Sequence, residues 1–190
     1  MLVRHATAAS TDLAAGLSAR GRAEAVALAG RLGDRQIDVA WSSDLKRAVE
    51  TAGAILTRHP SIPLRQSEAL REVDRPAGLD PAVDPGGYQA WERETVAGLA
   101  RGLQEWLGIV AGGEGPGVGS SVDAPHNRTI LVVSHGGPLR VLICLLLGLP
   151  PDRQWAFRLD HASLTVVEHG GDLGTLTLLN DRSHVLKVFA

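Results

Sequence analysis

Three short apolar stretches of this chain each run directly into a group of polar residues. The stretches are Leu2–Val3, Val39–Trp41 and Thr129–Ser134. The last of them, TILVVS, is rich in β-branched residues and bounded by turn residues, which is typical of a buried parallel strand. Because helical patterns separate these strands, the sequence predicts an α/β fold with a mostly parallel sheet.

The first half of the chain contains three of the expected helices. Ser18 can cap the first, and either Ser43 or Asp44 can cap the second. An irregular segment is expected at 74–87, where prolines and glycines are frequent, followed by a third helix over about 88–110.

The second half continues the alternation. A helix is expected from Gly136 to Leu147, and Leu164–Glu168 with Leu173–Leu179 is expected to form a hairpin. The Gly/Ser/Pro-rich stretch 111–127 predicts a flexible loop, and whether it covers a site stays open. Since the sequence contains no repeat and no sign of a second domain, we expect 1–190 to form a single domain.

The polar groups that follow the strands are expected to meet. Ligands bind at the carboxyl ends of the strands in parallel α/β sheets, where Arg4, His5, Ser42 and His135 would converge. Arg47 lies about one turn into the second helix and can reach back to the same crevice.

Two histidines and two arginines without carboxylates form a poor metal site but a good dianion site. Arginine forks match phosphate oxygens, and an uncharged imidazole can attack phosphorus. Gly136 lets the backbone N–H groups at the start of the fourth helix approach an anion. No metal and no cofactor are therefore expected.

The composition and net charge of the chain argue against several classes of partner and cofactor. The net charge of −2 provides no basic field for nucleic acid or an anionic membrane. Cys144 is the single cysteine and is expected to be buried in an apolar run, and no zinc-binding spacing occurs. Without a signal peptide or a stretch long enough to span a bilayer, a cytoplasmic protein is expected. A homodimer is compatible with these features, which do not fix the oligomeric state.

Several motifs, in order along almost the whole chain, resemble those of the histidine phosphatase superfamily, also called phosphoglycerate-mutase-like. The matching segments are Leu2-Val3-Arg4-His5-Ala6, Leu17-Ser18-Ala19-Arg20-Gly21, Trp41-Ser42-Ser43-Asp44-Leu45-Lys46-Arg47-Ala48, Leu70-Arg71-Glu72-Val73, Val133-Ser134-His135-Gly136-Gly137, and Asn180-Asp181 with Ser183-His184. The resemblance implies a three-layer sandwich in which helices flank the sheet, and it places the chain in the small phosphatase branch.

The resemblance also implies a metal-independent mechanism for hydrolysing a phosphomonoester. His5 would be the nucleophile and form a phosphohistidine, while Arg4, Arg47 and His135 would hold the phosphate oxygens. Glu72 would protonate the leaving alcohol and later deprotonate the attacking water, which requires a raised pKa.

The substrate stays open because the segments that shape the substrate pocket depart from the family pattern. Ala6 stands where the motif usually has glycine, and the segment from His5 to Leu17 is short. A phosphoglycerate mutase and a protein phosphohistidine phosphatase are alternative enzymes. A catalytically silent domain that binds a phosphorylated ligand is an alternative of a different class.

Four residues near the motifs have no assigned role. A surface or structural role is expected for Arg71, and a solvated or interface role for Arg140. His161 can border the site, but a structural hydrogen bond is equally compatible with its position, and the same holds for His184.

Overall fold

The computed structural model describes residues 1–111, 128–169 and 173–188. In this part of the chain six strands form one sheet in the order β3-β2-β4-β1-β5-β6. The strands are β1 (Leu2–Arg4), β2 (Val39–Ser42), β3 (Leu64–Gln66), β4 (Ile130–Ser134), β5 (Leu164–His169) and β6 (Gly174–Asp181). The first four in chain order run parallel, whereas β5 and β6 are antiparallel to their neighbours, so the sheet is mixed.

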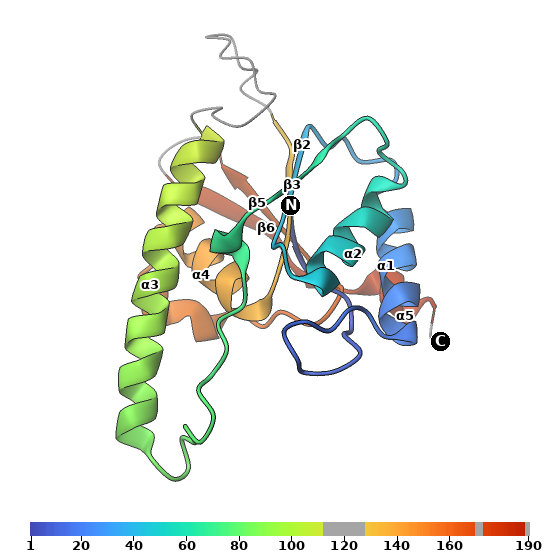
Figure 1. The fold of residues 1–190 in the computed structure, drawn as a ribbon. Helices are drawn as coiled ribbons and strands as arrows, with labels where there is room; N and C mark the ends of the chain where they lie inside the picture. Colours follow the sequence, from blue (N-terminus) through green and yellow to red (C-terminus); the bar gives the residue numbers. More distant parts are fainter. Residues whose placement is uncertain (112–127, 170–172, 189–190) are drawn as a thin grey trace.

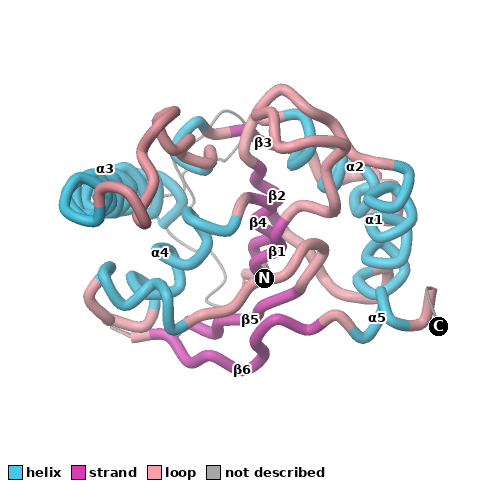
Figure 2. Tube along the Cα trace, turned by 90° about the horizontal axis from the view of Figure 1, so that it is seen from below, coloured by secondary structure: helices cyan, strands magenta, loops and turns pink. Residues whose placement is uncertain are grey.

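Helices cover both faces of the sheet (Figures 1 and 2). One layer contains α1 (Ala19–Leu32), α2 (Lys46–Leu56) and the short α5 (Ser183–Leu186), and the other contains α3 (Pro85–Ala111) and α4 (Gly136–Leu146). Two 3₁₀ turns, η1 (Glu68–Leu70) and η2 (Pro151–Ala156), lie in the connections. The three layers and the mostly parallel sheet confirm the expected fold class.

The N-terminal ends of two helices differ in how well the sequence predicts them. Ser18 caps α1 by accepting a hydrogen bond from the backbone N–H of Gly21 at 2.9 Å, as expected. The capping prediction for α2 is wrong, because Leu45 occupies the cap position and no side chain caps this helix. The two polar candidates are used elsewhere: Ser43 contacts His135, and the Asp44 carboxylate pairs with an arginine.

Helix α3 begins one turn earlier than its predicted start. Pro85 is its first residue, and the Asp84 carboxylate accepts a hydrogen bond from the backbone N–H of Gly87 at 2.9 Å. Proline at the first helical position and an aspartate just before it are favourable at a helix start. Residues 85–87 therefore belong to the helix and not to the irregular segment that precedes it.

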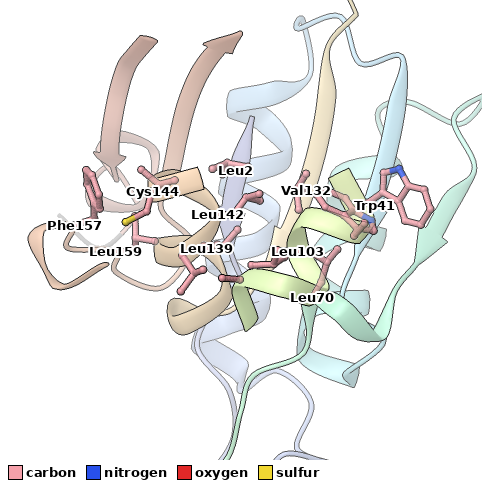
Figure 3. Packing of buried hydrophobic residues seen from close by; sticks show 14 of the residues in the cluster. Leu2, Trp41, Leu70, Leu103, Val132, Leu139, Leu142, Cys144, Phe157 and Leu159 are labelled. Atoms are coloured by element: carbon pink, nitrogen blue, oxygen red, sulfur yellow. The ribbon is translucent and has the colours of Figure 1, made fainter. Parts of the chain in front are cut away.

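A hydrophobic core lies on each face of the sheet. Between the sheet and the α3–α4 layer, Leu103 and Leu142 are buried among residues from several strands and helices (Figure 3). Trp41 of β2 and Trp106 of α3 meet edge to face, with ring centroids 5.8 Å apart. Cys144 is buried in the same core, which confirms its predicted packing role.

The C-terminal hairpin pairs β5 with β6, as predicted, and β6 forms the edge of the sheet. The side chains of β6 alternate between partly buried and exposed, as expected for a strand with one face on the protein. Residues 112–127, nearly all of the predicted flexible loop, lie outside the described residues. No helix in the described ranges has the length and apolarity needed to cross a membrane.

Candidate active site

Because β1, β2 and β4 pair in parallel, the three chain segments that follow them lie together at the carboxyl ends of these strands. Arg4 ends β1 and His5 follows it, while His135 comes directly after β4. Arg47 lies in the first turn of α2, and Glu72 follows η1 and a single connecting residue. Figure 2 looks at the molecule from below Figure 1, the side on which the connections between these strands and helices lie.

His5 is buried and its ring is fixed by the backbone. Its Nδ1 lies 2.7 Å from the carbonyl oxygen of Ala6, which can only accept, so Nδ1 carries the proton. Burial and the nearby His135 lower the pKa of His5 to about 2. The ring is therefore neutral near pH 7, and Nε2 presents a free lone pair.

The loop that carries His5 is tied to α2. The Ala6 N–H donates to Oγ1 of Thr51 at 3.1 Å, and that hydroxyl donates to the carbonyl of Arg47 at 2.7 Å. The N–H of His5 donates to the carbonyl of Ser134 at 2.9 Å. These bonds hold the backbone of His5 between β4 and α2.

His135 is fully buried, and both of its ring nitrogens are engaged. Nδ1 accepts from Nε of Arg47 at 3.3 Å, because an arginine nitrogen can only donate. Nε2 then donates to Oγ of Ser43 at 2.9 Å. Burial, Arg47 and Arg4 lower the pKa of His135 to about 3, so this ring is also neutral. The ring centroids of His5 and His135 are 4.9 Å apart.

Arg4 is held so that part of its guanidinium stays available. Nη1 donates to the carbonyl of Leu159 at 2.6 Å, and Nη2 lies 3.1 Å from Nε2 of His161. Its buried Nε has no hydrogen-bond partner among the described residues. A Cβ atom at Gly136 would lie 3.6 Å from Cζ of Arg4, so the start of α4 faces the guanidinium.

His161 belongs to the site. Its ring centroid lies 5.1 Å from that of His5, and burial and Arg4 lower its pKa to about 4. The next residue, Ala162, has a positive φ of 55° and donates its N–H to the carbonyls of Arg4 and His5. His184 contacts the carbonyl of Ala162 at 2.9 Å, so it supports this turn from behind.

Arg47 links the site to the short loop after His5. Nη1 donates to the carbonyls of Asp12 and Leu13, at 3.0 and 3.1 Å. The side chain is buried, yet arginine keeps its charge in such surroundings. These two hydrogen bonds hold the loop after His5 against the Arg47 guanidinium, which also contacts His135.

The Glu72 carboxyl lies over the start of α4. Burial raises its pKa, although hydrogen bonding from Gly137 and the charge of Arg4 act in the opposite direction. A Cβ atom at Gly137 would lie only 2.6 Å from Oε1 of Glu72. The absence of a side chain at Gly137 therefore makes room for a carboxyl that can hold a proton at higher pH than usual.

The structure brings together six of the seven residues that the sequence predicted for the site: Arg4, His5, Arg47, Glu72, His135 and Gly136. Ser42 does not join them through its side chain. Its hydroxyl is buried and has no hydrogen-bond partner among the described residues, and the neighbouring Ser43 contacts His135 instead. Side chains alternate between the two faces of a strand, and a count of residues could not tell which serine faces the site.

Other residues around the site resolve what the sequence left open. The sequence leaves two roles open for His161, which precedes a strand: bordering the site or making a structural hydrogen bond. The position of its ring beside that of His5 shows that it borders the site. Arg71 points away to Asp44 and Glu68, which confirms its structural role. Within the described ranges, His, Cys, Asp and Glu side chains form no group of three or more that could hold a metal ion.

Comparisons with known proteins identify the family of this chain. The model of the histidine phosphatase superfamily (branch 1) matches residues 1–182. Phosphoserine phosphatase 1 of Hydrogenobacter thermophilus is 28% identical over 176 residues, which are 89% of this chain and 82% of the relative. Glucosyl-3-phosphoglycerate phosphatase of Mycobacterium tuberculosis is 35% identical over 150 residues, 70% of this chain and 65% of the relative.

A solved structure shares the architecture. The mycobacterial glucosyl-3-phosphoglycerate phosphatase in complex with inorganic phosphate superimposes with a TM-score of 0.76 at 27% identity. The match covers 96% of this chain and 97% of that one. The fold similarity therefore extends over the sheet and both helical layers.

Proposed function

Because this chain belongs to the histidine phosphatase superfamily (branch 1), we propose that it hydrolyses a phosphorylated small molecule through a phosphohistidine on His5. The observation that carries this proposal is the fixed, neutral tautomer of His5, whose Nδ1 proton is held by the Ala6 carbonyl. Such a ring has its lone pair on Nε2, the atom that must attack phosphorus. The relatives named above are phosphatases, which supports the same chemistry.

Binding of the phosphate would depend on the cations at the sheet edge. Arg4 offers a buried Nε without a partner among the described residues, and Arg47 approaches from α2. Helix α4 begins at Gly136, and the backbone N–H groups at the start of a helix favour binding of an anion. A bound dianion would raise the pKa of His135, so Nδ1 would gain a proton and donate to a phosphate oxygen once Arg47 Nε turns to the anion.

In the first chemical step, Nε2 of His5 forms a bond to phosphorus as the bond from phosphorus to the alcohol oxygen breaks. Glu72 gives its proton to that oxygen, so the alcohol leaves uncharged. In the second step, the Glu72 carboxylate takes a proton from water, and the resulting oxygen attacks phosphorus. The bond to Nε2 then breaks, which releases inorganic phosphate and restores the starting enzyme.

The proposal is tested by assaying phosphate release from an aryl phosphate, with vanadate as an inhibitor that mimics the five-coordinate phosphoryl group. We expect turnover and inhibition by vanadate. Acid-labile, alkali-stable labelling from a radioactive phosphate donor would report the phosphohistidine. Binding of phosphate without any release would contradict the proposal and favour a silent phospho-ligand domain.

A mutase assay tests one of the two alternative enzymes, since one relative, of Erwinia tasmaniensis, is named a probable phosphoglycerate mutase. An assay with a phosphohistidine-containing protein as substrate tests the other. We expect no interconversion of the two monophosphoglycerates in the presence of 2,3-bisphosphoglycerate.

The proposal further treats 1–190 as one domain, because the family model matches nearly all of it. It includes no nucleic-acid partner, in line with the net charge of −2.

A further inference from the structure

Arg140 is a third arginine close to the proposed phosphate site. It lies one turn along α4 from Gly136 and Gly137, on the same face of the helix. Its Nε donates to the carbonyl of Phe157 at 3.0 Å, and the side chain is half-buried. The guanidinium is therefore fixed in position by the segment that follows η2.

Trp155 supports the guanidinium from one side. Cζ of Arg140 lies 4.7 Å from the centre of the indole ring, a distance at which a cation and an aromatic face attract each other. The indole N–H donates to Oε1 of Glu92 on α3, which ties η2 to that helix. Trp155 is nevertheless 61% exposed, an unusual state for a tryptophan held by two partners.

The remaining donors of Arg140 are unused within the described residues. Neither Nη1 nor Nη2 has a hydrogen bond there, and no carboxylate lies within ion-pair distance of the guanidinium. Arginine is the side chain best suited to bind carboxylate or phosphate through two parallel hydrogen bonds. A guanidinium held in position with two unused donor groups can therefore bind an anion.

Arg140 lies on the side of the site that holds Glu72, from which the alcohol would leave in the proposed mechanism. The Glu72 carboxyl, the proposed proton donor, rests over Gly137, one turn before Arg140. The negative charge of Glu72 acts to raise the pKa of Arg140, and the positive charge of Arg140 acts to lower the pKa of Arg4. When Glu72 carries the proton that it gives to the alcohol, the negative charge of this carboxylate near Arg140 is absent.

We propose that Arg140, supported by Trp155, binds a negatively charged group on the alcohol part of the substrate. The preferred substrates are then phosphomonoesters whose alcohol carries a carboxylate or a second phosphate. This inference rests on the proposed function, because it takes Glu72 as the marker of the leaving-group side. It assigns Arg140 to substrate selection and not to the transfer of the phosphoryl group.

The test compares pairs of substrates that differ only in the added negative group. O-phosphoserine against O-phosphoethanolamine isolates the carboxylate, and a sugar bisphosphate against its monophosphate isolates the second phosphate. We expect the wild-type kcat/KM to favour the more negative member of at least one pair by about tenfold or more, as for a charge-assisted hydrogen bond. The pair that shows the preference identifies the class of anion.

Variants then assign the preference to one side chain. Arg140→Met keeps a long stem on Trp155 and removes the charge, so we expect the preference to fall by about tenfold. Arg140→Lys keeps the charge but loses the fork, and an intermediate preference is expected. Arg153→Met is the matched control, because Arg153 is an exposed arginine of η2 and its variant should keep the wild-type preference.

The outcomes separate this inference from the proposed function. If wild-type protein hydrolyses an aryl phosphate but prefers the more negative member of neither pair, the role of Arg140 is overturned and the phosphatase stands. The same holds if Arg140→Met and Arg153→Met retain equal preferences. If no phosphate ester is hydrolysed, the aryl phosphate included, both proposals fail. Should Arg140→Met not fold, the wild-type preference and Arg140→Lys still decide the question.

Discussion

Nδ1 of His5 donates a hydrogen bond to the backbone carbonyl of Ala6, its own neighbour in the chain, over 2.7 Å. This contact fixes both the tautomer and the orientation of the ring, since a carbonyl oxygen accepts and never donates. The adjacent N–H of Ala6 is held in turn by Thr51 at 3.1 Å. The reactivity proposed for His5 thus depends on the backbone around it as well as on the imidazole.

Replacing His5 by Ala should abolish turnover, with a loss of at least about a thousandfold in kcat, because no other group offers a lone pair at that position. Phosphate release from an aryl phosphate measures the loss. His169→Ala is a suitable control, since His169 is an exposed residue at the end of β5. Turnover that survives in His5→Ala would disprove the nucleophile assignment.

Glu72→Gln should slow transfer from an alkyl phosphate by about a hundredfold or more, because an alkoxide is a poor leaving group without a proton. An aryl phosphate should be affected less. The raised pKa of Glu72 places its acid form at higher pH than usual, so the wild-type rate of phosphorylation should fall as pH rises through that pKa.

Single-turnover phosphorylation measured across pH checks this expectation. The falling alkaline limb should disappear in Glu72→Gln, which cannot lose a proton. An unchanged limb in the variant would assign the titration to a different group.

Gly137→Ala and Gly21→Ala should fail in different ways. A Cβ at Gly137 meets the end of the Glu72 side chain, which can move, so kcat should drop about tenfold while the free energy of unfolding changes by less than about 1 kcal/mol. A Cβ at Gly21 would lie 1.9 Å from the carbonyl oxygen of Thr7, which cannot easily move. That variant should lose about 1–3 kcal/mol of stability.

Urea unfolding and steady-state kinetics on both variants measure these effects. Equal losses of stability in the two variants would contradict the view that Glu72 is the group displaced at Gly137.

The buried histidines predict how stability depends on pH. The pKa values of His5 and His135 lie at about 2 and about 3 in the folded protein, well below that of a free imidazole. The unfolded chain therefore binds more protons than the folded one below about pH 6.5, and stability should fall as pH decreases. Each ring contributes at most about 1.4 kcal/mol per pH unit.

Urea unfolding between about pH 7.5 and 5.5 measures this slope. The lowered pKa values of His161 and His184 add to it in the same direction. His135→Gln removes one titrating ring, so its slope should be shallower, and an unchanged slope would show that the pKa of His135 is not lowered in the folded state.

A chelator should leave the rate of phosphate release unchanged. The positive charge of the proposed site comes from Arg4 and Arg47. His135 uses both ring nitrogens for contacts with protein groups, and His5 uses Nδ1. The measurement compares turnover before and after treatment with EDTA, followed by addition of Mg²⁺ or Zn²⁺. Strong inhibition that a metal reverses would contradict a metal-independent mechanism.

Much of the fold follows from local patterns. The apolar run of β4 and the capping serine of α1 each have a physical signal within a few residues, and the structure confirms both. The start of α2 could not be predicted from local sequence in this way. Ser43 and Asp44 contact His135 and Arg71, which lie far away in the chain, and neither side chain caps the helix. Competition between a local cap and a distant partner leaves no trace in the local sequence.

The sequence by itself determined the alternation of strands and helices and the polar residues at the strand ends. Parallel strands gather their carboxyl ends at one edge, so Arg4, His5 and His135 were expected together. Only the tertiary structure decided that His161 lies beside His5 and that Arg140 rests on Trp155. These contacts join segments through the turn before β5 and the η2 region, whose path depends on how the whole chain packs and not on any periodic pattern.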